Sequence, residues 1–438
     1  MNEQELAASK ADPSLYQEQN QFIPTEDQQQ AIDQLLAFIQ EPASFNWCFC
    51  FRGYAGTGKT SCMREVARRV GYSNARFAYT APTNKAAKVL REVVGEASTI
   101  YSLLGLRVDK NGETKQITHG KPVDLSDLDV IVVDEASMVN AHLFGLLQDI
   151  ADKFDLKVVF MGDPAQLPPV KEAESLALSG ETGVQLTKVM RHDNQILQLV
   201  TDIREVVFSP SPCVNIKSNN AHNEGVWKLS KVEFRKKIYE AAERNEFADG
   251  RTTKVISWRN VKVNEYNQIA RQAIFGMEAQ PGFFLVGDRV VAAGPCERGD
   301  ELLLHTDDEA IVEGIVECKH PVNPKYHALE LKCRTEDNRI VRLLVIHPVS
   351  QAAFDNDCQL LAHEAAANPK LWRRFWYLKD SFMDIRYAYA LTAHRSQGST
   401  YVNTFVDFQD ILYNRSRTEA FKCLYVACSR AQKRLYLA

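Results

Sequence analysis

Apolar residues recur with two different periods along the first part of the chain. A helical spacing of apolar side chains follows Thr25, a residue type that commonly caps helix N-termini. The apolar positions of this expected helix are Ala31, Ile32, Leu35, Leu36 and Ile39. Short uninterrupted apolar runs, each typical of a buried strand, occupy residues 47–51, 76–80, 130–133 and 157–161. Because helical segments separate these runs, we expect an α/β fold with a parallel sheet covered on both faces.

Two segments depart from this alternation. Residues 106–117 form two arms of mixed polar and apolar residues around Asn111-Gly112, a dipeptide that strongly favours a β-hairpin turn. Between residues 287 and 346 the apolar positions take the period of short strands, which predicts a small barrel-like all-β insertion. The strands expected there are 289–293, 310–317, 328–333 and 339–346.

These changes of pattern divide the chain into two α/β domains, two insertions and a leader. The leader is polar, lacks the apolar segment of a secretory signal, and is expected to be flexible. The expected boundaries are 1–22 for the leader, 23–180 for the first domain with its hairpin insertion at 106–127, 181–283 and 382–438 for the two parts of the second domain, and 284–381 for the β insertion with its helical extension.

The composition is that of an average globular protein and excludes several classes. Of 438 residues, 45% are apolar and 25% are charged, which excludes a disordered, coiled-coil or collagen-like chain. No run approaches the ~20 apolar residues that cross a bilayer, so we expect a soluble, cytoplasmic protein with no membrane partner. The formal net charge of −4 gives no global attraction for nucleic acid, which does not exclude a single basic groove. The ten cysteines show no zinc-ligand spacing and are expected to be reduced thiols.

The segment after the first expected strand has the chemistry of a phosphate cradle. Residues 53–60 fit G-x-x-x-x-G-K-[ST] between a strand and a helix. The backbone N–H groups of such a loop surround phosphate oxygens, and the helix N-terminus adds a favourable dipole. Lys59 is expected to reach the β- and γ-phosphates, and the Thr60 hydroxyl to bind Mg²⁺. The expected nucleotide contacts are Gly53, Ala55, Gly56, Thr57, Gly58, Lys59 and Thr60.

An acidic pair supplies the second half of the expected site. Asp134 and Glu135 follow directly after the apolar run 130–133, where a buried strand would deliver them to the edge of the sheet. Asp134 is the expected metal ligand, and Glu135 can orient and deprotonate the attacking water. A nucleotide switch without hydrolysis does not need the second acid, so the pair predicts an NTPase.

Several further motifs resemble those of superfamily 1 helicases and occur in the family order. Residues 162–170, Gly-Asp-Pro-Ala-Gln-Leu-Pro-Pro-Val, resemble motif III. The other resemblances are to motif Ia at 81–87, motif Ib at 97–102, motif V at 390–400, motif VI at 424–431 and the adenine-reading Q motif at 25–31. The Q-L-P-P-V and Q-G-S-T endings favour the RecD/Dda branch of superfamily 1B, and the short chain is most similar to the phage Dda helicases.

The resemblance implies two RecA-like P-loop motor domains, with the hairpin as domain 1B and an SH3-like β insertion as domain 2B. It also implies ATP hydrolysis with Mg²⁺ in the cleft between the motors, 5′→3′ movement on single-stranded DNA, and unwinding of duplex at a fork. The hairpin is then the expected wedge. A monomer in prokaryotic or phage-infected cytoplasm is expected, with a single-strand-binding protein or replisome component as the partner type. Replication, recombination and repair all remain open as pathways.

The resemblance also assigns roles around the γ-phosphate. Arg191 and Arg430 lie within motifs IV and VI, and a guanidinium that is always charged can bridge phosphate oxygens as a transition-state finger. Gln166 is expected to sense the γ-phosphate and couple it to closure of the cleft. Gln28 is expected to hydrogen-bond adenine, and Gly398 of motif V to border the nucleotide.

The expected strand contacts belong to both motor domains. In the first, motifs Ia and Ib offer polar side chains that can bind phosphates, and in the second motif V offers the matching set. Trp258 and Arg259 are expected to stack on bases or contact phosphates. The residues of motifs Ia, Ib and V are Thr83, Asn84, Lys85, Thr99, Tyr101, Thr392, His394 and Arg395.

Other functions remain open at this point. The chain resembles a helicase subunit that could act within a RecBCD-like nuclease complex, although it carries no nuclease carboxylate constellation of its own. An ATP-gated nucleic-acid clamp or remodelling factor would share the P-loop but would not unwind processively. An RNA helicase of superfamily 1 is a further alternative, since nothing in the sequence reads a 2′-hydroxyl.

Overall fold

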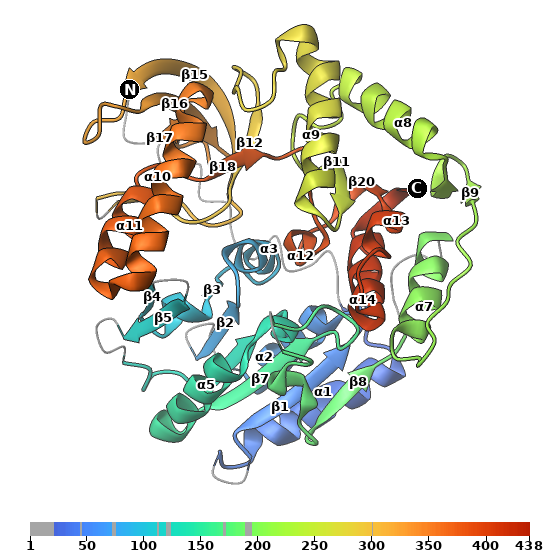
Figure 1. Cartoon of the computed structure of the whole chain (residues 1–438). Helices are drawn as coiled ribbons and strands as arrows, with labels where there is room; N and C mark the ends of the chain where they lie inside the picture. The colour runs from blue at the N-terminus through green and yellow to red at the C-terminus, as the bar shows by residue number, and fades with distance from the viewer. Residues whose placement is uncertain are drawn as a thin grey trace, which may run out of the picture.

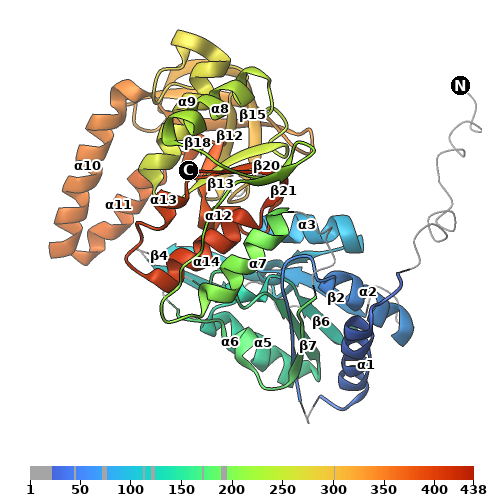
Figure 2. The same cartoon turned by 90° about the vertical axis from the view of Figure 1, so that its right-hand side faces the viewer.

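The computed structural model describes residues 22–43, 46–71, 76–111, 114–119, 124–169, 172–188, 195–299 and 301–438. The predicted leader at 1–22 lies outside these residues except for Phe22. Two α/β units and a β-rich insertion surround helix α3 (Asn84–Val94) in Figure 1, with the first unit at the bottom. Figure 2, turned by 90°, separates the first unit from the second unit and the insertion.

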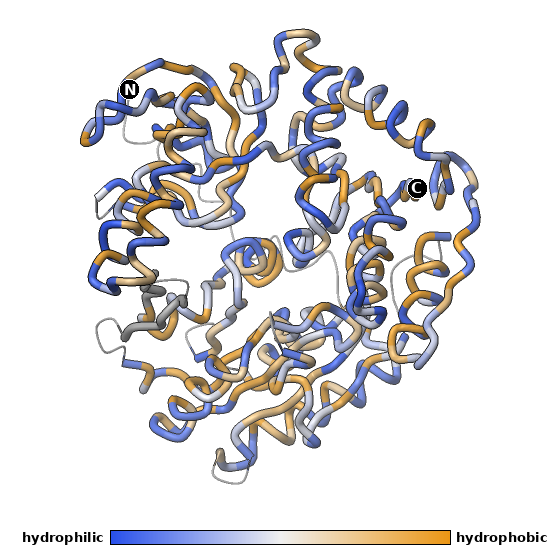
Figure 3. The backbone as a smooth tube through the Cα atoms, viewed as in Figure 1, coloured by the Kyte–Doolittle hydropathy of each residue, from blue (hydrophilic) through white to orange (hydrophobic). Residues whose placement is uncertain are grey.

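The first unit contains a six-stranded sheet in which every neighbouring pair is parallel. Its order in space is β3 (Ser98–Thr99), β2 (Phe77–Ala81), β6 (Val130–Val133), β7 (Lys157–Gly162), β1 (Cys48–Gly53) and β8 (Gly183–Leu186). Strands β6 and β7 are buried along their whole length. In Figure 3 the tube through β1 and β7 is mostly orange, as the continuous apolar runs predict for a doubly covered sheet.

Alternate residues of the central strands face opposite helical layers. Val130 and Val132 of β6 belong to one hydrophobic core, and Ile131 and Val133 belong to another. The first core lies under α1 (Glu26–Gln40), α2 (Lys59–Val70) and α3. The second lies under α4 (Ile100–Leu103), α5 (Ala141–Phe154) and α6 (Leu176–Ser179), beside the short 3₁₀ turn η2 (Ala136–Met138). Because successive side chains of a strand point to opposite faces of the sheet, one apolar strand contributes to both cores.

Strand β8 corrects the predicted boundary of the first domain. Its residues 183–186 pair in parallel with residues 50–53 of β1. The expected division at residue 180 falls before this strand, so the first unit extends at least to Leu186. The pairing joins segments more than a hundred residues apart, and the local apolar pattern of a four-residue strand does not reveal its partner.

The second unit has its own six-stranded sheet, parallel except at β9. Its order is β19 (Ala390–Thr392), β11 (Thr253–Ser257), β20 (Tyr401–Val406), β21 (Ala431–Leu437), β10 (Glu224–Lys228) and β9 (Asn219–Ala221). One face packs against α7 (Gln195–Val207), α12 (Ala393–Ser396), α13 (Phe408–Ile411) and α14 (Arg417–Cys428). The other face packs against α8 (Lys231–Glu243) and α9 (Asn260–Phe275), which ends at the 3₁₀ turn η3 (Gly276–Glu278).

The insertion is an antiparallel five-stranded sheet with a helical extension. Its order is β17 (Ile340–Ile346), β16 (His327–Thr335), β15 (Glu309–Lys319), β12 (Arg289–Ala292) and β18 (Ile385–Tyr387). A two-stranded ribbon, β13 (Cys296–Arg298) and β14 (Glu301–Leu304), accompanies it. The extension is α10 (Pro348–Ala367), the 3₁₀ turn η4 (Pro369–Leu371) and α11 (Trp372–Lys379). Because β18 completes the sheet, the insertion extends beyond its predicted end at 381.

The predicted hairpin at 106–117 is present as two antiparallel strands. Strand β4 (Leu106–Asn111) pairs with β5 (Thr114–His119), from Leu106 opposite His119 to Asn111 opposite Thr114. The two residues of the turn itself, 112 and 113, lie outside the described residues. Within the described part of the chain, no helix is long and apolar enough to span a membrane.

A buried ion pair fastens the insertion to the second unit. The guanidinium of Arg271 on α9 donates from Nε and Nη2 to the two carboxylate oxygens of Asp288, at 2.8 and 2.9 Å, and both side chains are 0% exposed. Asp288 also accepts hydrogen bonds from the backbone N–H of Leu285 and the hydroxyl of Tyr389. The root of the insertion is thus fixed by one fully partnered carboxylate.

We expect Asp288→Asn to destabilise the protein strongly. The substitution leaves the buried Arg271 charge without its counter-charge, and breaking such a pair costs about 3–5 kcal/mol. The shift of the urea unfolding midpoint, multiplied by the unfolding slope, measures the loss. Asp384→Asn is the matched control, since Asp384 pairs with Arg386 at the surface and its loss should cost less than about 1 kcal/mol. Equal shifts for the two variants would contradict the expectation.

Candidate functional site

The glycine-rich loop joins β1 to α2 as the sequence predicts. Gly56 and Gly58 adopt φ angles of +82° and +85°, a region that favours glycine. A Cβ atom on Gly58 would lie 2.7 Å from Nε2 of Gln28, so a side chain there would displace that amide. Lys59 donates from Nζ to the backbone oxygens of Gly53, at 2.6 Å, and Tyr54, at 3.2 Å. The loop is therefore closed around its own lysine, and the expected contact of Lys59 with phosphate stays a prediction.

Gln28 supports this loop and caps the first helix. Its Oε1 accepts from the backbone N–H of Thr25 at 3.0 Å, and its Nε2 donates to the backbone oxygen of Thr57 at 3.0 Å. The residue is 3% exposed. These two bonds use one lone pair of Oε1 and one of the two Nε2 hydrogens, so the adenine contact expected for Gln28 stays a prediction. Gln28 acts as a brace between α1 and the phosphate loop.

The acidic pair stands at the end of β6, beside Thr60. Thr60, Asp134, Glu135 and Gly398 line one small cavity, which also contacts helix α3. Asp134 accepts from the backbone N–H of Glu135 at 2.8 Å, and burial raises the pKa of its carboxyl group. Glu135 has a left-handed backbone with φ of +51°, an unfavourable conformation for a residue with a side chain, often found where a functional group is held in place.

The protonation of Glu135 is set by its position in the cleft. Burial, and next the negative charge of Asp134, raise the pKa of Glu135 to about 7. The positive charges of Arg430 and Lys59 act in the opposite direction. Arg430 also lies near this cavity, because its guanidinium donates to the backbone oxygen of Ser399, next to Gly398, which lines the cavity with Thr60 and Glu135.

Arg430 lies at the end of α14 and is 4% exposed. Its guanidinium donates to the backbone oxygens of Val426 and Ser399, both at 2.9 Å, and to the hydroxyl of Ser429 at 2.8 Å. Among the described residues, no carboxylate forms an ion pair with it. A buried guanidinium held by neutral partners retains its full charge for an anion. Its predicted partner, Arg191, lies outside the residues that the structure describes.

Three side chains connect the two units directly across the cleft. Gln397 of motif V donates from Nε2 to Oε1 of Gln166 at 3.0 Å and to the hydroxyl of Ser137 at 3.1 Å. Gln166 is 4% exposed, so this contact is closed to solvent. Gln166 therefore contacts the opposite unit directly, and its expected role as a γ-phosphate sensor stays a prediction.

A second contact joins the two α/β units through residues that the sequence motifs did not single out. Tyr425 on α14 donates its hydroxyl to Oδ2 of Asp163 at 2.5 Å, and the same oxygen accepts from the backbone N–H of Ala55 in the phosphate loop at 3.2 Å. Arg204 on α7 stacks over the ring of Tyr54, 3.7 Å from its centroid. Asp163 and Tyr425 lie inside the motif III and motif VI segments, which are the sequence signal for them. Arg204 carries no such signal.

The predicted strand-contacting threonines share one structural role. Thr83, Thr99 and Thr392 are the N-caps of α3, α4 and α12, and each hydroxyl accepts from a backbone N–H of its own helix. Asn84 is the first residue of α3. The hydroxyl hydrogens are still available to donate, and the capped N-termini carry a partial positive charge.

Two predicted cationic contacts are engaged elsewhere. Arg395 donates from Nε to Asp307 of the insertion at 2.6 Å, and Arg259 donates from Nε to Asp410 at 2.5 Å. Each guanidinium therefore has a carboxylate partner within the protein, and its expected contact with the DNA strand stays a prediction. The partners are far away in the sequence, so the motifs did not indicate them.

The remaining predicted contacts lie beside these elements. Lys85 donates from Nζ to the hydroxyl of Tyr401 at 3.4 Å. Burial acts to lower the pKa of Lys85, but the nearby Tyr401, Glu309 and Asp307 have the larger combined effect, so the pKa is raised. Tyr101 and Trp258 are half-buried and pack against hydrophobic cores. This packing gives each a structural role, and their expected contacts with DNA stay predictions.

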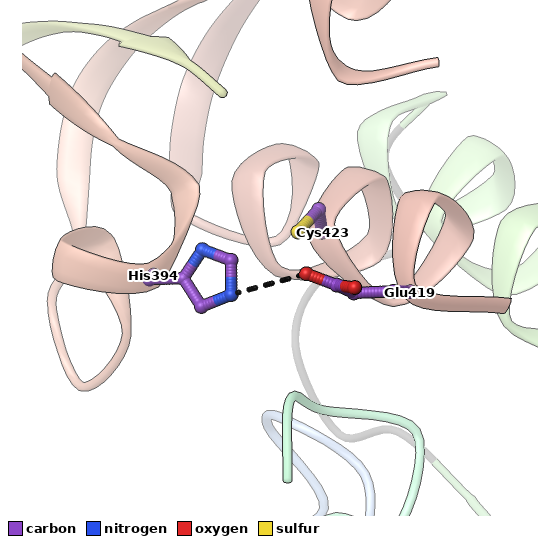
Figure 4. A group of neighbouring side chains, drawn as sticks. All are labelled: His394, Glu419 and Cys423. Atoms are coloured by element: carbon purple, nitrogen blue, oxygen red, sulfur yellow. Dashed lines mark ion pairs between the residues drawn. The ribbon is translucent and has the colours of Figure 1, made fainter. Parts of the chain in front are cut away.

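His394 lies next to two side chains that could bind a metal. Figure 4 shows His394 facing Glu419 and Cys423 of α14, with His394 Nε2 3.7 Å from Glu419 Oε1. Burial, and next the charge of Glu419, raise the pKa of Cys423 to about 12, so the thiol is protonated. A metal ligand must be a thiolate, and the arrangement is better described as a histidine–glutamate pair over a buried thiol.

Comparisons with known proteins agree with this geometry. A family model described as an AAA domain matches residues 24–206, and a model of the UvrD-like helicase C-terminal domain matches residues 387–438. The chain is 23% identical to the uncharacterized protein R530 of Acanthamoeba polyphaga mimivirus, over 93% of this chain and 98% of that one. It is 21% identical to the ATP-dependent DNA helicase dda of Enterobacteria phage T4, over 93% and 97% of the two chains.

A solved structure supports the fold. The Pif1 helicase from Bacteroides in complex with ADP-AlF3 and ssDNA aligns with a TM-score of 0.50 at 16% identity, covering 95% of this chain and 92% of that one. The two α/β units accordingly have the RecA-like fold. The two family models and the helicase relative together identify the chain as an ATP-dependent helicase of the RecD/Dda-like branch of superfamily 1B.

Proposed function

We propose that this ATP-dependent DNA helicase moves 5′→3′ along single-stranded DNA and separates duplex at a fork. The main support is the composite cleft, in which Thr60 and Glu135 of the first unit line one cavity with Gly398 of the second. Arg430 donates to the backbone oxygen of Ser399, the residue after Gly398. A site divided between two units opens and closes as they move, so hydrolysis can be coupled to movement. The direction rests on the resemblance of the motifs to the RecD/Dda branch.

The residues beside the phosphate loop fit Mg²⁺. Thr60 and Asp134 line the same cavity and offer a hydroxyl and a carboxylate oxygen, the hard oxygen ligands that Mg²⁺ prefers. We assign these two residues to the metal, which when bound neutralises charge on the phosphates. Lys59 then binds phosphate, Glu135 holds and deprotonates the attacking water, and Arg430 stabilises the charge that develops across the cleft.

Strand contacts follow from the capped helices. We assign Thr83, Asn84 and Thr99 to one strand-binding segment on the first unit, and Thr392 with His394 to another on the second. Closing the cleft changes the distance between these segments, and alternating affinity then produces steps along the strand. The hairpin β4–β5 is the proposed wedge that meets the fork.

Strand separation on two partial duplexes tests this proposal. One substrate carries a 5′ single-stranded tail and the other a 3′ tail, with ATP and Mg²⁺ present. We expect unwinding of the 5′-tailed duplex alone. Lys59→Ala should reduce this unwinding to the level without ATP, because it removes the cation that binds the phosphates. A catalytically silent control is Lys153→Ala, since Lys153 lies at the far end of α5.

The other results each contradict part of the proposal. Unwinding of the 3′-tailed duplex alone would reverse the assigned direction. ATP hydrolysis stimulated by single-stranded DNA without any strand separation would favour a clamp, or a helicase subunit that needs a partner. If the Lys59→Ala protein unwinds as fast as the parent protein, unwinding does not depend on this nucleotide site.

A further inference from the structure

The helical extension of the insertion ends in a strongly basic segment. The pair α10 and α11 stands out from the body of the protein in Figure 2, and α11 is linked to α10 through η4. Residues 369–379 contain Lys370, Arg373, Arg374 and Lys379 and no acidic residue. This local charge contrasts with the net charge of −4 of the whole chain.

Two of these cations share one face with an exposed tyrosine. Arg373 and Arg374 precede Tyr377 by four and three residues on α11, which places these three side chains on one side of the helix. Lys370 lies just before them, in the 3₁₀ turn η4. All four are exposed, and Tyr377 is 67% exposed. The opposite side carries Phe375, which is 8% exposed and packs edge-on against Trp372 and Trp376. The aromatic side anchors α11, and the basic side is presented to solvent.

The cations of this face are not neutralised within the described protein. Among the residues that the structure describes, no carboxylate forms an ion pair with Lys370, Arg373 or Arg374. Lys379, on the anchored side, lies 4.8 Å from the ring centroid of Trp376. By contrast, Lys236 and Lys237 on α8 each lie within 4.0 Å of a carboxylate oxygen of Glu240. The face on α11 thus exposes uncompensated positive charge at a fixed helical spacing.

The position of this face indicates its ligand. In both Figure 1 and Figure 2, α11 lies beside the hairpin β4–β5, the proposed wedge. The proposed single-strand contacts are elsewhere, on α3, α4 and α12. Tyr377 is the one aromatic residue of the face, and a single ring does not form a platform for successive bases. A row of cations without such a platform suits the regular phosphates of a duplex.

We propose that Lys370, Arg373, Arg374 and Tyr377 bind the phosphate backbone of duplex DNA ahead of the hairpin. This inference rests on the proposed function, because it takes the duplex to lie in front of the wedge. Contacts to phosphate carry no sequence information, so the face binds duplex DNA of any sequence. A duplex held there is restricted from turning away from the fork. Binding there adds to the grip on the single strand without contributing to hydrolysis.

Equilibrium binding to a blunt duplex tests this assignment. The variant Arg373→Gln with Arg374→Gln is compared with Lys236→Gln with Lys237→Gln, which removes the same charge from α8. Affinities for a labelled blunt duplex and for a single strand are measured by fluorescence anisotropy at several salt concentrations, without nucleotide. We expect about tenfold weaker duplex binding for the α11 variant and a log–log salt slope lower in magnitude by about 2. The affinity for single-stranded DNA, and the ATPase rate that single-stranded DNA stimulates, should equal those of the α8 control variant.

Each other outcome would overturn the assignment. Duplex binding as strong as in the α8 control would remove duplex DNA as the ligand and point to an acidic protein surface instead. Equal losses for duplex and single strand would show a non-specific charge effect or a single-strand contact. The measurement needs no unwinding, so a loss confined to duplex would support the face even if the parent protein fails to separate strands.

Discussion

Replacing Arg430 by alanine is expected to lower the ATP hydrolysis rate by about 10³-fold or more. The guanidinium is buried, is held by the backbone oxygens of Val426 and Ser399, and has no carboxylate partner among the described residues. Its bond to the Ser399 oxygen holds it beside Gly398, which lines the cavity of Thr60 and Glu135, and a cation there can stabilise the negative charge that develops during phosphoryl transfer. Steady-state ATPase with saturating single-stranded DNA measures the loss.

Two further variants separate catalysis from folding. Arg430→Lys keeps the charge but loses the planar fork, so we expect it to remain impaired while retaining the thermal midpoint of the parent protein. Arg434→Ala is the control, because Arg434 lies on β21, which begins directly after Arg430, and its side chain donates to the backbone oxygen of Asn223. Near-parental ATPase in Arg430→Ala would refute the finger assignment.

The second large effect is expected for Glu135→Gln. The substitution preserves the volume of the side chain and removes its ability to take a proton, a change that costs about 10²- to 10⁴-fold in rate. ATP and single-stranded DNA should still bind, because among the described residues this carboxylate forms no hydrogen bond or ion pair with the phosphate loop or the capped helices. The predicted phenotype is therefore a protein that binds both ligands and turns over slowly.

Single-turnover hydrolysis, with nucleotide binding followed separately, distinguishes the chemical step from binding. Glu181→Gln is a suitable control, since Glu181 is an exposed carboxylate of the same chain with no ion pair among the described residues. A Glu135→Gln protein that hydrolyses ATP at the parental rate would move the general base to another residue. A protein that no longer binds ATP would indicate a structural role for Glu135 at the strained end of β6.

Much of the site follows from local sequence because its chemistry is local. The phosphate loop needs glycines at positive φ directly between a strand and a helix, and Gly56 and Gly58 meet that need. Asp134 and Glu135 follow the buried run of β6 immediately, so the strand itself delivers them to the sheet edge. The alternation of Val130 and Ile131 between two cores likewise follows from the geometry of a strand.

The tertiary structure alone decided which distant groups became partners. Gln28 braces the phosphate loop, Arg395 binds Asp307 of the insertion, and Tyr425 reaches Asp163 on the other motor unit. Each of these pairs joins segments separated by at least 29 residues, and a side chain shows in the sequence what it can bind but not what it will face. The same reason explains the shifted domain boundaries, since β8 and β18 pair with strands far away in the chain. The sequence determined the chemistry of the motor, and the packing of its two units determined which side chains are free to perform it.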